Sequence, residues 1–246
     1  MFQSCKLLLP VLAGILYLGC SKEPEDSVKE GKTTRYWDAC KPSCAWTNNT
    51  KNSPNGTAKS CSIDGSILSS NNTPSSCGGG TAFACMDQAP WAVDDSLSYG
   101  FAASHTTGDC GKCYELQFTS GSVLGKTMVV MISNIGGDVK PGQFDLMIPG
   151  GGVGQFNALS NQITHNGSTP NLGQQYGGFR SACGANNKDC VQNMCNSNFG
   201  TPALAYLKAG CEWYINWFNI ADNPKVDYKQ IDCPQALIGR YSNGKY

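Results

Sequence analysis

Cysteine is the residue that most constrains this fold, because the chain contains 14 cysteines among its 246 residues. A chain of this length can bury a sizeable hydrophobic core, so it does not need cysteines merely to fold. So many thiols indicate either disulfides formed in an oxidising compartment or the coordination of metal ions. Whether the chain is exported therefore decides how the cysteines are interpreted.

The first residues of the chain indicate export. Lys6 provides a short positive region, and residues 7–19 form an apolar run. That run is too short to cross a bilayer as a helix but has the length of a signal-peptide core. It ends at Gly19-Cys20 and resembles a bacterial lipoprotein signal, in which cleavage leaves a lipidated cysteine at the new N-terminus. We therefore predict a signal peptide over residues 1–19 and a lipid anchor on Cys20, with ordinary cleavage and an intact anchor as alternatives.

Export changes the count of cysteines available for pairing. Cys5 is lost with the signal and Cys20 carries the lipid, which leaves 14 − 2 = 12, an even number. The chain has only two histidines, and no second Cys-x-x-Cys at zinc spacing matches the one at Cys110 and Cys113. We therefore expect disulfides, with no metal and no cofactor.

Composition and charge divide the rest of the chain. Residues 20–32 are almost entirely polar and predict a flexible tether, so a single domain is expected over residues 33–246. Eighteen basic and 18 acidic side chains give no net charge, which argues against nucleic-acid binding. Apart from the possible N-terminal lipid, we expect no contact with a membrane.

The domain is predicted to be mainly β. Two runs form a hairpin around a turn at Gly121-Ser122, and two shorter runs are further strands. In chain order these four runs are residues 113–119, 126–133, 144–148 and 213–218. Short helices are expected over residues 94–103, where Asp94 is a possible cap, and over residues 201–209. Thr201 as N-cap, Pro202 at the first helical position and Gly210 as C-cap support the second helix.

Several nucleotide and nucleophile motifs are excluded. Residues 121–127 (GSVLGKT) have three residues between the glycines instead of four, and a strand follows where a phosphate-binding loop needs a helix. The chain has no Gly-x-Ser-x-Gly elbow. Carboxylates and aromatic side chains remain, and these suit carbohydrate chemistry, because two acids cleave glycosidic bonds and sugar rings stack on aromatic faces.

Residues 33–46, TTRYWDACKPSCAW, resemble the N-terminal signature of glycoside hydrolase family 45 endoglucanases, and residues 136–154 resemble a second block of that family. Lesser blocks follow in family order at residues 88–93 with 100–103, 175–178 and 217–224. The resemblance covers residues 33–240. It implies a six-stranded double-psi β-barrel with long disulfide-linked loops and short helices, which makes residues 33–246 a catalytic domain.

The resemblance also implies an inverting endo-β-1,4-glucanase that acts on cellulose or β-glucan without a cofactor. Asp38 aligns with the general base and Asp145 with the general acid. Asp138 aligns with an auxiliary carboxylate, whose charge would raise the pKa of the acid. Tyr36 aligns with an active-site tyrosine and Trp46 with a tryptophan that stacks on sugar.

The sequence departs from the family at two kinds of position. Gln143 stands where the family commonly has histidine, which predicts an altered pH optimum because an amide does not titrate. Cysteines are missing in matched pairs, for example at Ala39 and near Ala158. The remaining pairs implied by the family are Cys40–Cys77, Cys44–Cys110, Cys61–Cys85 and Cys113–Cys233. Residues 184–200 resemble an insertion, so the pairing of the last four cysteines stays open, and we favour Cys183–Cys211 with Cys190–Cys195.

Two other classes of protein compete with the hydrolase. Expansin-like proteins bind cell-wall glucan without cleaving it; they share the barrel and the acid-bearing block but lack the base, so Asp38 favours the hydrolase. The third hypothesis is a disulfide-rich surface adhesin whose carboxylates have no catalytic role. In every case we expect a monomer that is exported to the cell surface or the medium, with a polysaccharide as its partner.

Overall fold

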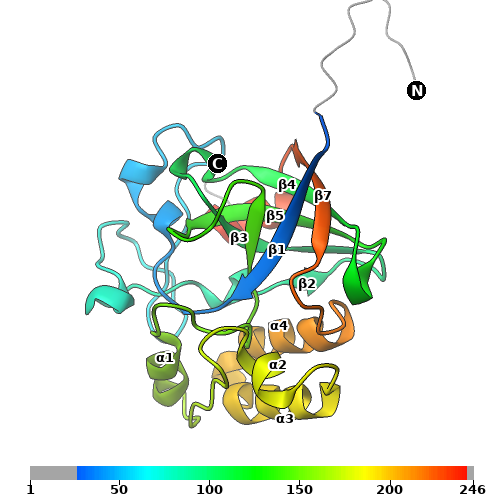
Figure 1. Cartoon of the computed structure of the whole chain (residues 1–246). Coiled ribbons are helices and arrows are strands. Elements are labelled where there is room, and N and C mark those ends of the chain that lie inside the picture. The colour runs from blue at the N-terminus through cyan, green and yellow to red at the C-terminus, as the bar shows by residue number, and fades with distance from the viewer. Residues whose placement is uncertain (1–26, 243–246) are drawn as a thin grey trace, which may run out of the picture.

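The computed structural model describes residues 27–242, and the predicted signal peptide and Cys20 lie outside them. A seven-stranded sheet forms the centre of the fold, in the order β2-β3-β5-β4-β7-β1-β6 (Figure 1). Its strands are β1 (Lys29–Tyr36), β2 (Trp91–Ala92), β3 (Leu97–Ser104), β4 (Cys113–Phe118), β5 (Thr127–Ile135), β6 (Gln143–Met147) and β7 (Lys225–Ile231).

The sheet closes on itself. Ala102 and Ala103 of β3 pair with Leu146 and Asp145 of β6, so β6, at one end of the strand order, meets β3 near the other end. Six strands therefore form a barrel, and the two-residue β2 is added beside β3. The pairs β1–β6 and β3–β5 are parallel and the other pairs are antiparallel. The prediction of a six-stranded, mainly β barrel is confirmed.

Most of the strand predictions are confirmed. β4 and β5 form the antiparallel pair expected from residues 113–119 and 126–133, and β6 matches residues 144–148. One boundary is corrected, because β1 begins at Lys29 and residues 29–32 of the predicted tether pair with β7. These residues are mostly exposed, so their polar composition belongs to a solvated stretch of strand.

The helix predicted over residues 94–103 is wrong, since most of this segment is β3. Asp94 caps a turn, not a helix: its carboxylate accepts hydrogen bonds from the backbone N–H groups of Ser96 (2.7 Å) and Leu97 (2.8 Å). Gly100 lies where a Cβ would come within 2.5 Å of the Met128 side chain on β5. Close packing between two barrel strands therefore overrides the local preference.

The strand predicted over residues 213–218 is also wrong. A 3-10 helix, Pro202–Leu204, begins at the predicted proline, and α4 (Ala205–Asn216) continues through the predicted C-cap, Gly210. Gly210 is buried, and a Cβ there would lie 2.7 Å from that of Ala89, so the glycine serves a close contact. The ring centroids of Trp213 and Trp217 are 5.3 Å apart and the rings stack. Residues four positions apart lie on the same face of a helix, so this contact fits a helix and not a strand.

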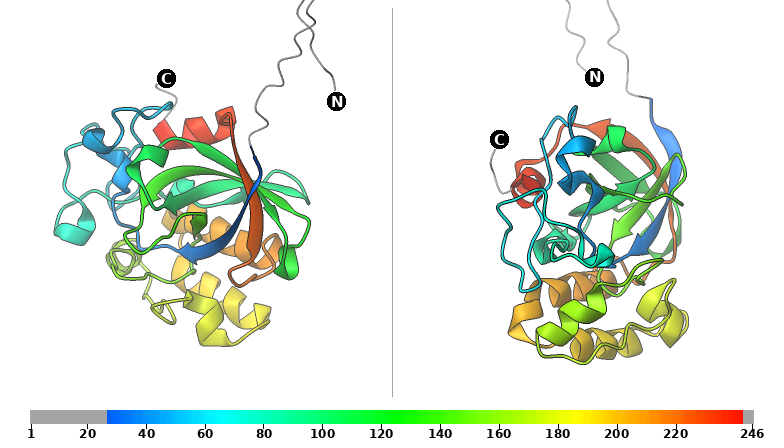
Figure 2. Two further views of the ribbon diagram at one scale, coloured as in Figure 1. Left: turned by 45° about the horizontal axis from the view of Figure 1, so that its top comes forward. Right: turned by 90° about the vertical axis from the view of Figure 1, so that its left-hand side faces the viewer.

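Four further helices complete the fold: α1 (Leu159–His165), α2 (Gly178–Cys183), α3 (Lys188–Phe199) and α5 (Gln235–Ser242). Helices α1 to α4 gather on one side of the barrel, away from the start of β1 (Figures 1 and 2). Within residues 27–242, no helix has the length and apolar character needed to cross a membrane.

Six disulfides crosslink residues 27–242, and four of them are the predicted pairs Cys40–Cys77, Cys44–Cys110, Cys61–Cys85 and Cys113–Cys233. The last two predictions are wrong, because the bonds are Cys183–Cys190 and Cys195–Cys211. Cys190 and Cys195 both lie on α3, where five residues turn a side chain by about 140°, so they cannot meet. Cys190 instead faces the end of α2, and Cys195 faces α4.

Candidate active site

The three predicted carboxylates line one cavity of about 370 Å³ on the side of the barrel, together with Tyr36. A second cavity of about 400 Å³ shares Tyr36, Asp138 and Asp145 with the first. The two cavities are therefore neighbouring parts of one open groove. Residues more than 100 positions apart meet there because parallel pairing places β1 beside β6.

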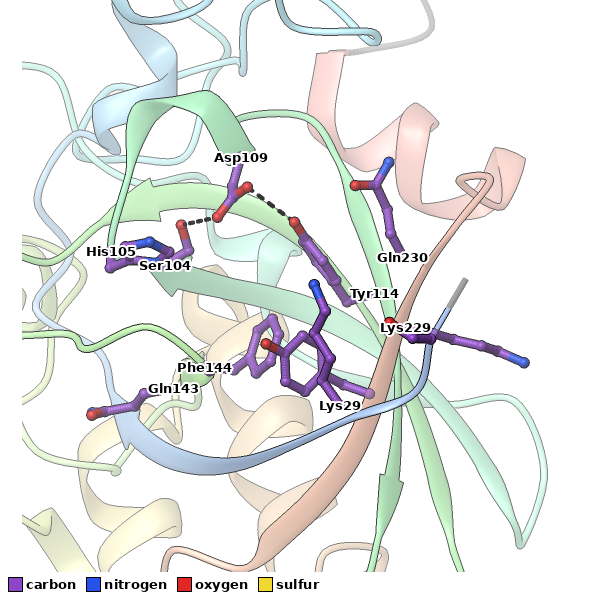
Figure 3. A pocket seen from close by; sticks show the side chains of 12 residues that line it. Lys29, Ser104, His105, Asp109, Tyr114, Gln143, Phe144, Lys229 and Gln230 are labelled. Atoms are coloured by element: carbon purple, nitrogen blue, oxygen red, sulfur yellow. Dashed lines mark hydrogen bonds between the residues drawn. The ribbon is translucent and has the colours of Figure 1, made fainter. Parts of the chain in front are cut away.

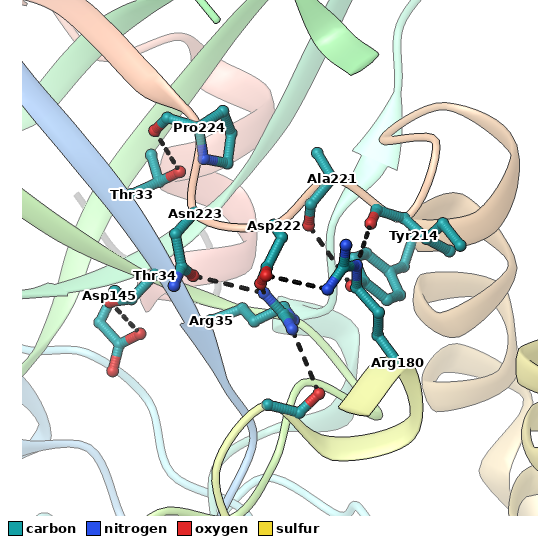
Figure 4. Close-up of polar contacts among 12 residues, drawn as sticks. Thr33, Thr34, Arg35, Asp145, Arg180, Tyr214, Ala221, Asp222, Asn223 and Pro224 are labelled. Atoms are coloured by element: carbon teal, nitrogen blue, oxygen red, sulfur yellow. Dashed lines mark hydrogen bonds and ion pairs between the residues drawn. The ribbon is translucent and has the colours of Figure 1, made fainter. Parts of the chain in front are cut away.

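Asp145 is held on β6 between β1 and β3. Thr34, its partner across β1, donates a hydrogen bond of 2.6 Å from its hydroxyl to Oδ1 of Asp145 (Figure 4). The Gln143 amide in turn donates to Oγ1 of Thr34 at 3.1 Å. Burial raises the pKa of Asp145 to about 7; the Thr34 bond opposes this rise, and the charges of Asp138 and Asp38 add to it.

Asp38 lies just beyond the end of β1. Its Oδ1 accepts a 2.8 Å hydrogen bond from the backbone N–H of Cys40, and its own carbonyl accepts from the N–H groups of Ala158 and Leu159. The chain turns directly after it, since Ala39 has φ 62°. Burial raises the pKa of Asp38 to about 6, below that of Asp145.

Tyr36 is buried and lines the same cavity as the two acids. Its hydroxyl accepts a 2.8 Å hydrogen bond from the amide of Asn134, and Oδ1 of that amide accepts from the N–H of Ser43. Burial, together with the charges of Asp38 and Asp145, holds the pKa of Tyr36 well above its ordinary value. Asn134 was not among the residues singled out from the sequence, although it is a polar residue that directly follows the predicted strand at residues 126–133.

Asp138 is exposed on the loop between β5 and β6. That loop is anchored by hydrogen bonds from the Gly136 N–H to the Ser104 carbonyl and from the Val139 N–H to the Gly136 carbonyl. The negative charge of Asp138 contributes to the raised pKa of Asp145. Within residues 27–242, no three His, Cys, Asp or Glu side chains are grouped as a metal site.

Trp46 does not line either cavity of the groove. Its ring lies against Lys41, whose ammonium is 3.3 Å from the ring centroid. Lys41 lines the first cavity and donates to the backbone carbonyls of Asn71 (2.6 Å) and Thr73 (3.0 Å). Burial lowers the pKa of Lys41 to about 8. Trp46 therefore packs against Lys41, and the Lys41 side chain forms part of the cavity wall.

Two aromatic side chains that the sequence did not single out lie on the groove. Phe156 lines the first cavity and Tyr176 the second, and they are 50% and 67% exposed. Exposed rings beside acids are surfaces on which the apolar face of a sugar can pack. Tyr176 lies in a family-like block, so its position was visible in the sequence, but its exposure was not.

Arg35 supports the groove from within the protein. Its guanidinium donates to Asp222 (2.7 Å), Asn223 (3.3 Å) and the Gly177 carbonyl (3.2 Å), as Figure 4 shows. Arg180 binds the other oxygen of Asp222 at 2.8 Å. This network ties β1 to the loop before β7 and to the start of α2.

The chain is also similar to known proteins in sequence and in fold. The sequence pattern of the family described as "Glycosyl hydrolase family 45" matches residues 30–244. The chain is 45% identical to "Endoglucanase B" of Cellvibrio japonicus (strain Ueda107), over 89% of the chain and 46% of that protein. It is 42% identical to a relative from Fusarium oxysporum over 51% of that protein, so the chain spans about half the length of these two relatives.

A third relative is matched over most of its length. The "Endoglucanase" of Cryptopygus antarcticus is 40% identical, over 84% of this chain and 85% of that protein. The crystal structure of the cellulase from the same springtail has a TM-score of 0.73 and covers 87% of this chain and 96% of that one, at 38% identity.

Proposed function

The chain belongs to glycosyl hydrolase family 45, and we propose from this premise that it hydrolyses internal β-1,4-glucosidic bonds of cellulose or β-glucan with inversion. One observation carries the proposal: two partly buried carboxyl groups of one cavity have raised pKa values, and the value of Asp145 is the higher. Two acids with different protonation states are what glycosidic cleavage requires.

The roles of the two acids follow from that order. Asp145 donates its proton to the leaving glycosidic oxygen as the bond to the anomeric carbon breaks. Asp38 accepts a proton from a water molecule, whose oxygen attacks the same carbon from the opposite face. Water is consumed, Asp145 is left ionised and Asp38 protonated, and exchange with solvent restores both.

The pH dependence follows with its sign. Activity needs Asp38 ionised, so the rate falls as the pH drops below about 6. It also needs Asp145 protonated, so the rate falls as the pH rises above about 7. Because the charge of Asp38 also acts on Asp145, the two limits belong to the pair and not to either acid alone.

The groove suits a polymer without charge. It is open along two cavities, so a long chain can enter from the side, as internal cleavage requires. Phe156 and Tyr176 offer exposed rings along it, and Tyr36 lines it together with the acids. Trp46 remains a predicted stacking residue at the far side of Lys41.

A defined cello-oligosaccharide tests the reaction. We expect the purified protein to cleave an internal bond and to release the α-anomer first, observed by proton NMR within the first minutes. Asp145→Asn should abolish this cleavage without unfolding the protein, and so should Asp38→Asn. Near-normal hydrolysis by Asp145→Asn would overturn the assignment of the acid.

The expansin-like alternative predicts a different outcome. A protein of that kind binds glucan without producing new reducing ends, and it needs no carboxylate at position 38. A reducing-sugar assay on soluble β-1,4-glucan separates the two functions.

The six disulfides and the likeness to cellulases support an exported protein, and lipidation of Cys20 remains a prediction that mass spectrometry of the mature N-terminus can test.

A further inference from the structure

A separate cavity of about 290 Å³ lies at the end of the barrel where β1 begins (Figure 3). In Figure 1 this end of the barrel is the one away from α1 to α4. Five strands line the cavity, through Lys29 of β1, Ser104 of β3, Tyr114 of β4, Phe144 of β6 and Tyr228 of β7. We propose that this cavity, the barrel-mouth pocket, is a second sugar-binding site that holds one residue of a glucan chain outside the groove.

The position of the pocket follows from strand alternation. Tyr114 shares its face of β4 with Leu116 and Phe118, and both of these are fully buried in the barrel. Phe118, at the other end of β4, packs against Trp217 and Phe218, which follow α4. Aromatic side chains thus fill that end of the barrel, whereas the end beside Tyr114 stays open. Mouths of β-barrels are common places for small-ligand sites.

Three aromatic rings make the floor of the pocket. The ring centroids of Tyr114 and Phe144 are 5.2 Å apart, those of Phe144 and Tyr228 are 5.0 Å apart, and those of Tyr114 and Tyr228 are 6.1 Å apart. Each ring is held by the other two in a tilted or edge-on contact, so the floor is fixed before a ligand arrives. The two tyrosines are only partly buried and present ring surface to the cavity.

The rim carries an oriented hydrogen-bond acceptor. The Asp109 carboxylate accepts from the hydroxyls of Ser104 (3.0 Å) and Tyr114 (2.9 Å), as Figure 3 shows, and its ion pair with Lys112 is 3.6 Å long. A carboxylate has about four acceptor positions, so Asp109 retains capacity for the hydroxyls of a ligand. An aromatic floor with a fixed carboxylate at its edge matches the apolar face and hydroxyl edge of a pyranose.

The charges around the pocket favour an uncharged ligand. Asp109 is paired with Lys112, whereas Lys229 points away from the cavity and forms its 3.0 Å ion pair with Glu115 on the face of β4 opposite Tyr114. Lys29 and His105 also line the cavity, so the rim mixes charges of both signs with neutral amides. A rim of this kind offers donors and acceptors together, which hydroxyl groups use and a simple anion does not.

Gln143 connects the pocket with the groove. It lines both the barrel-mouth pocket and the second cavity of the groove, and its amide donates a hydrogen bond to the hydroxyl of Thr34. A sugar in the pocket would therefore lie one side chain away from the groove. The choice of a glucan as ligand rests on the proposed function, and the pocket itself does not.

Cellobiose titrated into Asp145→Asn, followed by amide NMR, tests the inference without hydrolysis. We expect two separate groups of shifted signals, one around Asp38 in the groove and one around Tyr114 and Tyr228. Gln230→Trp places an indole at the rim, because Gln230 lines the pocket. We expect it to weaken the second binding event about tenfold, a loss of about 1.4 kcal/mol, while the groove signals titrate unchanged.

Gln117→Trp is the matched control, since Gln117 is exposed on β4 and its side chain lies on the face opposite Tyr114. It should leave both binding events unchanged. Tyr114→Phe, which removes only a hydroxyl, should weaken the second event and keeps the test open if Gln230→Trp misfolds. The inference is overturned if only groove signals shift, if Gln230→Trp binds like Gln117→Trp, or if inorganic phosphate produces the same shifts. Hydrolysis of a cello-oligosaccharide by the unchanged protein tests the proposed function separately.

Discussion

The hydroxyl of Thr34 is predicted to set the upper pH limit of activity. It donates a 2.6 Å hydrogen bond to Asp145, and this bond lowers the pKa of that acid against the effect of burial. Thr34→Val removes the hydroxyl and keeps the shape of the side chain. The ionised form of Asp145 then loses a donor, so its pKa should rise further above about 7.

The size of the shift follows from the strength of such bonds. A hydrogen bond to a charged group contributes about 1.5–3 kcal/mol, and one pKa unit corresponds to about 1.4 kcal/mol. Because Asp145 is only partly buried and water can replace part of the bond, we expect a rise of about one unit. The basic limb of the profile of kcat/KM against pH should move up by that amount.

The assay is the initial rate on a soluble cello-oligosaccharide across the pH range, because kcat/KM reports the ionisations of the free enzyme. The acidic limb should stay in place, because the Thr34 hydroxyl donates to Asp145 and not to Asp38. Thr34→Ser is the matched control, since it retains the donor and should retain the profile. A basic limb that stays in place or moves down in Thr34→Val would refute the reasoning.

Three further predictions concern stability and covalent structure. Asp145 has a folded pKa above its unfolded value of about 4, so the native state binds more protons than the unfolded state between about pH 4 and 7 and loses stability as the pH rises through this window. Asp145→Asn should therefore be more stable than the unchanged protein by about 1–3 kcal/mol at pH 8, but not at pH 4, in urea unfolding. Gly210→Ala should destabilise by about 1–3 kcal/mol in the same assay, because its Cβ would lie 2.7 Å from that of Ala89; Gly239→Ala, with open space around the Cβ on α5, is the control. Non-reducing peptide mapping should recover a fragment that joins Cys183 to Cys190, and a fragment that joins Cys190 to Cys195 would contradict the fold.

The family-like blocks carried much of the site in the sequence. Asp38, Asp138 and Asp145 were located by their alignment with those blocks, and the structure brings all three into one cavity with Tyr36. Their hydrogen-bond partners were not foreseen. Thr34 and Asn134 bind acids or hydroxyls that lie about 100 positions away, and no local pattern reports a contact over that separation.

The wrong prediction at residues 213–218 has a physical cause. The apolar run from Trp213 to Phe218 suits a buried strand or a buried helix equally well, because short apolar runs carry no clear period. Its helical state follows from packing, since α4 fits Gly210 against Ala89 and stacks Trp213 on Trp217. Local propensity could not reveal either contact.

The sequence by itself determined a disulfide-rich, mainly β domain through its composition and its strand patterns. Its resemblance to the family supplied four of the six disulfides seen in residues 27–242 and named three carboxylates that line one cavity. Tertiary structure alone decided the pairing of the last four cysteines, because the direction of each thiol depends on the turn of α3. It also decided the protonation of the acids. A pKa depends on burial and on neighbouring charge, and both arise only when barrel closure brings β1 and β6 together.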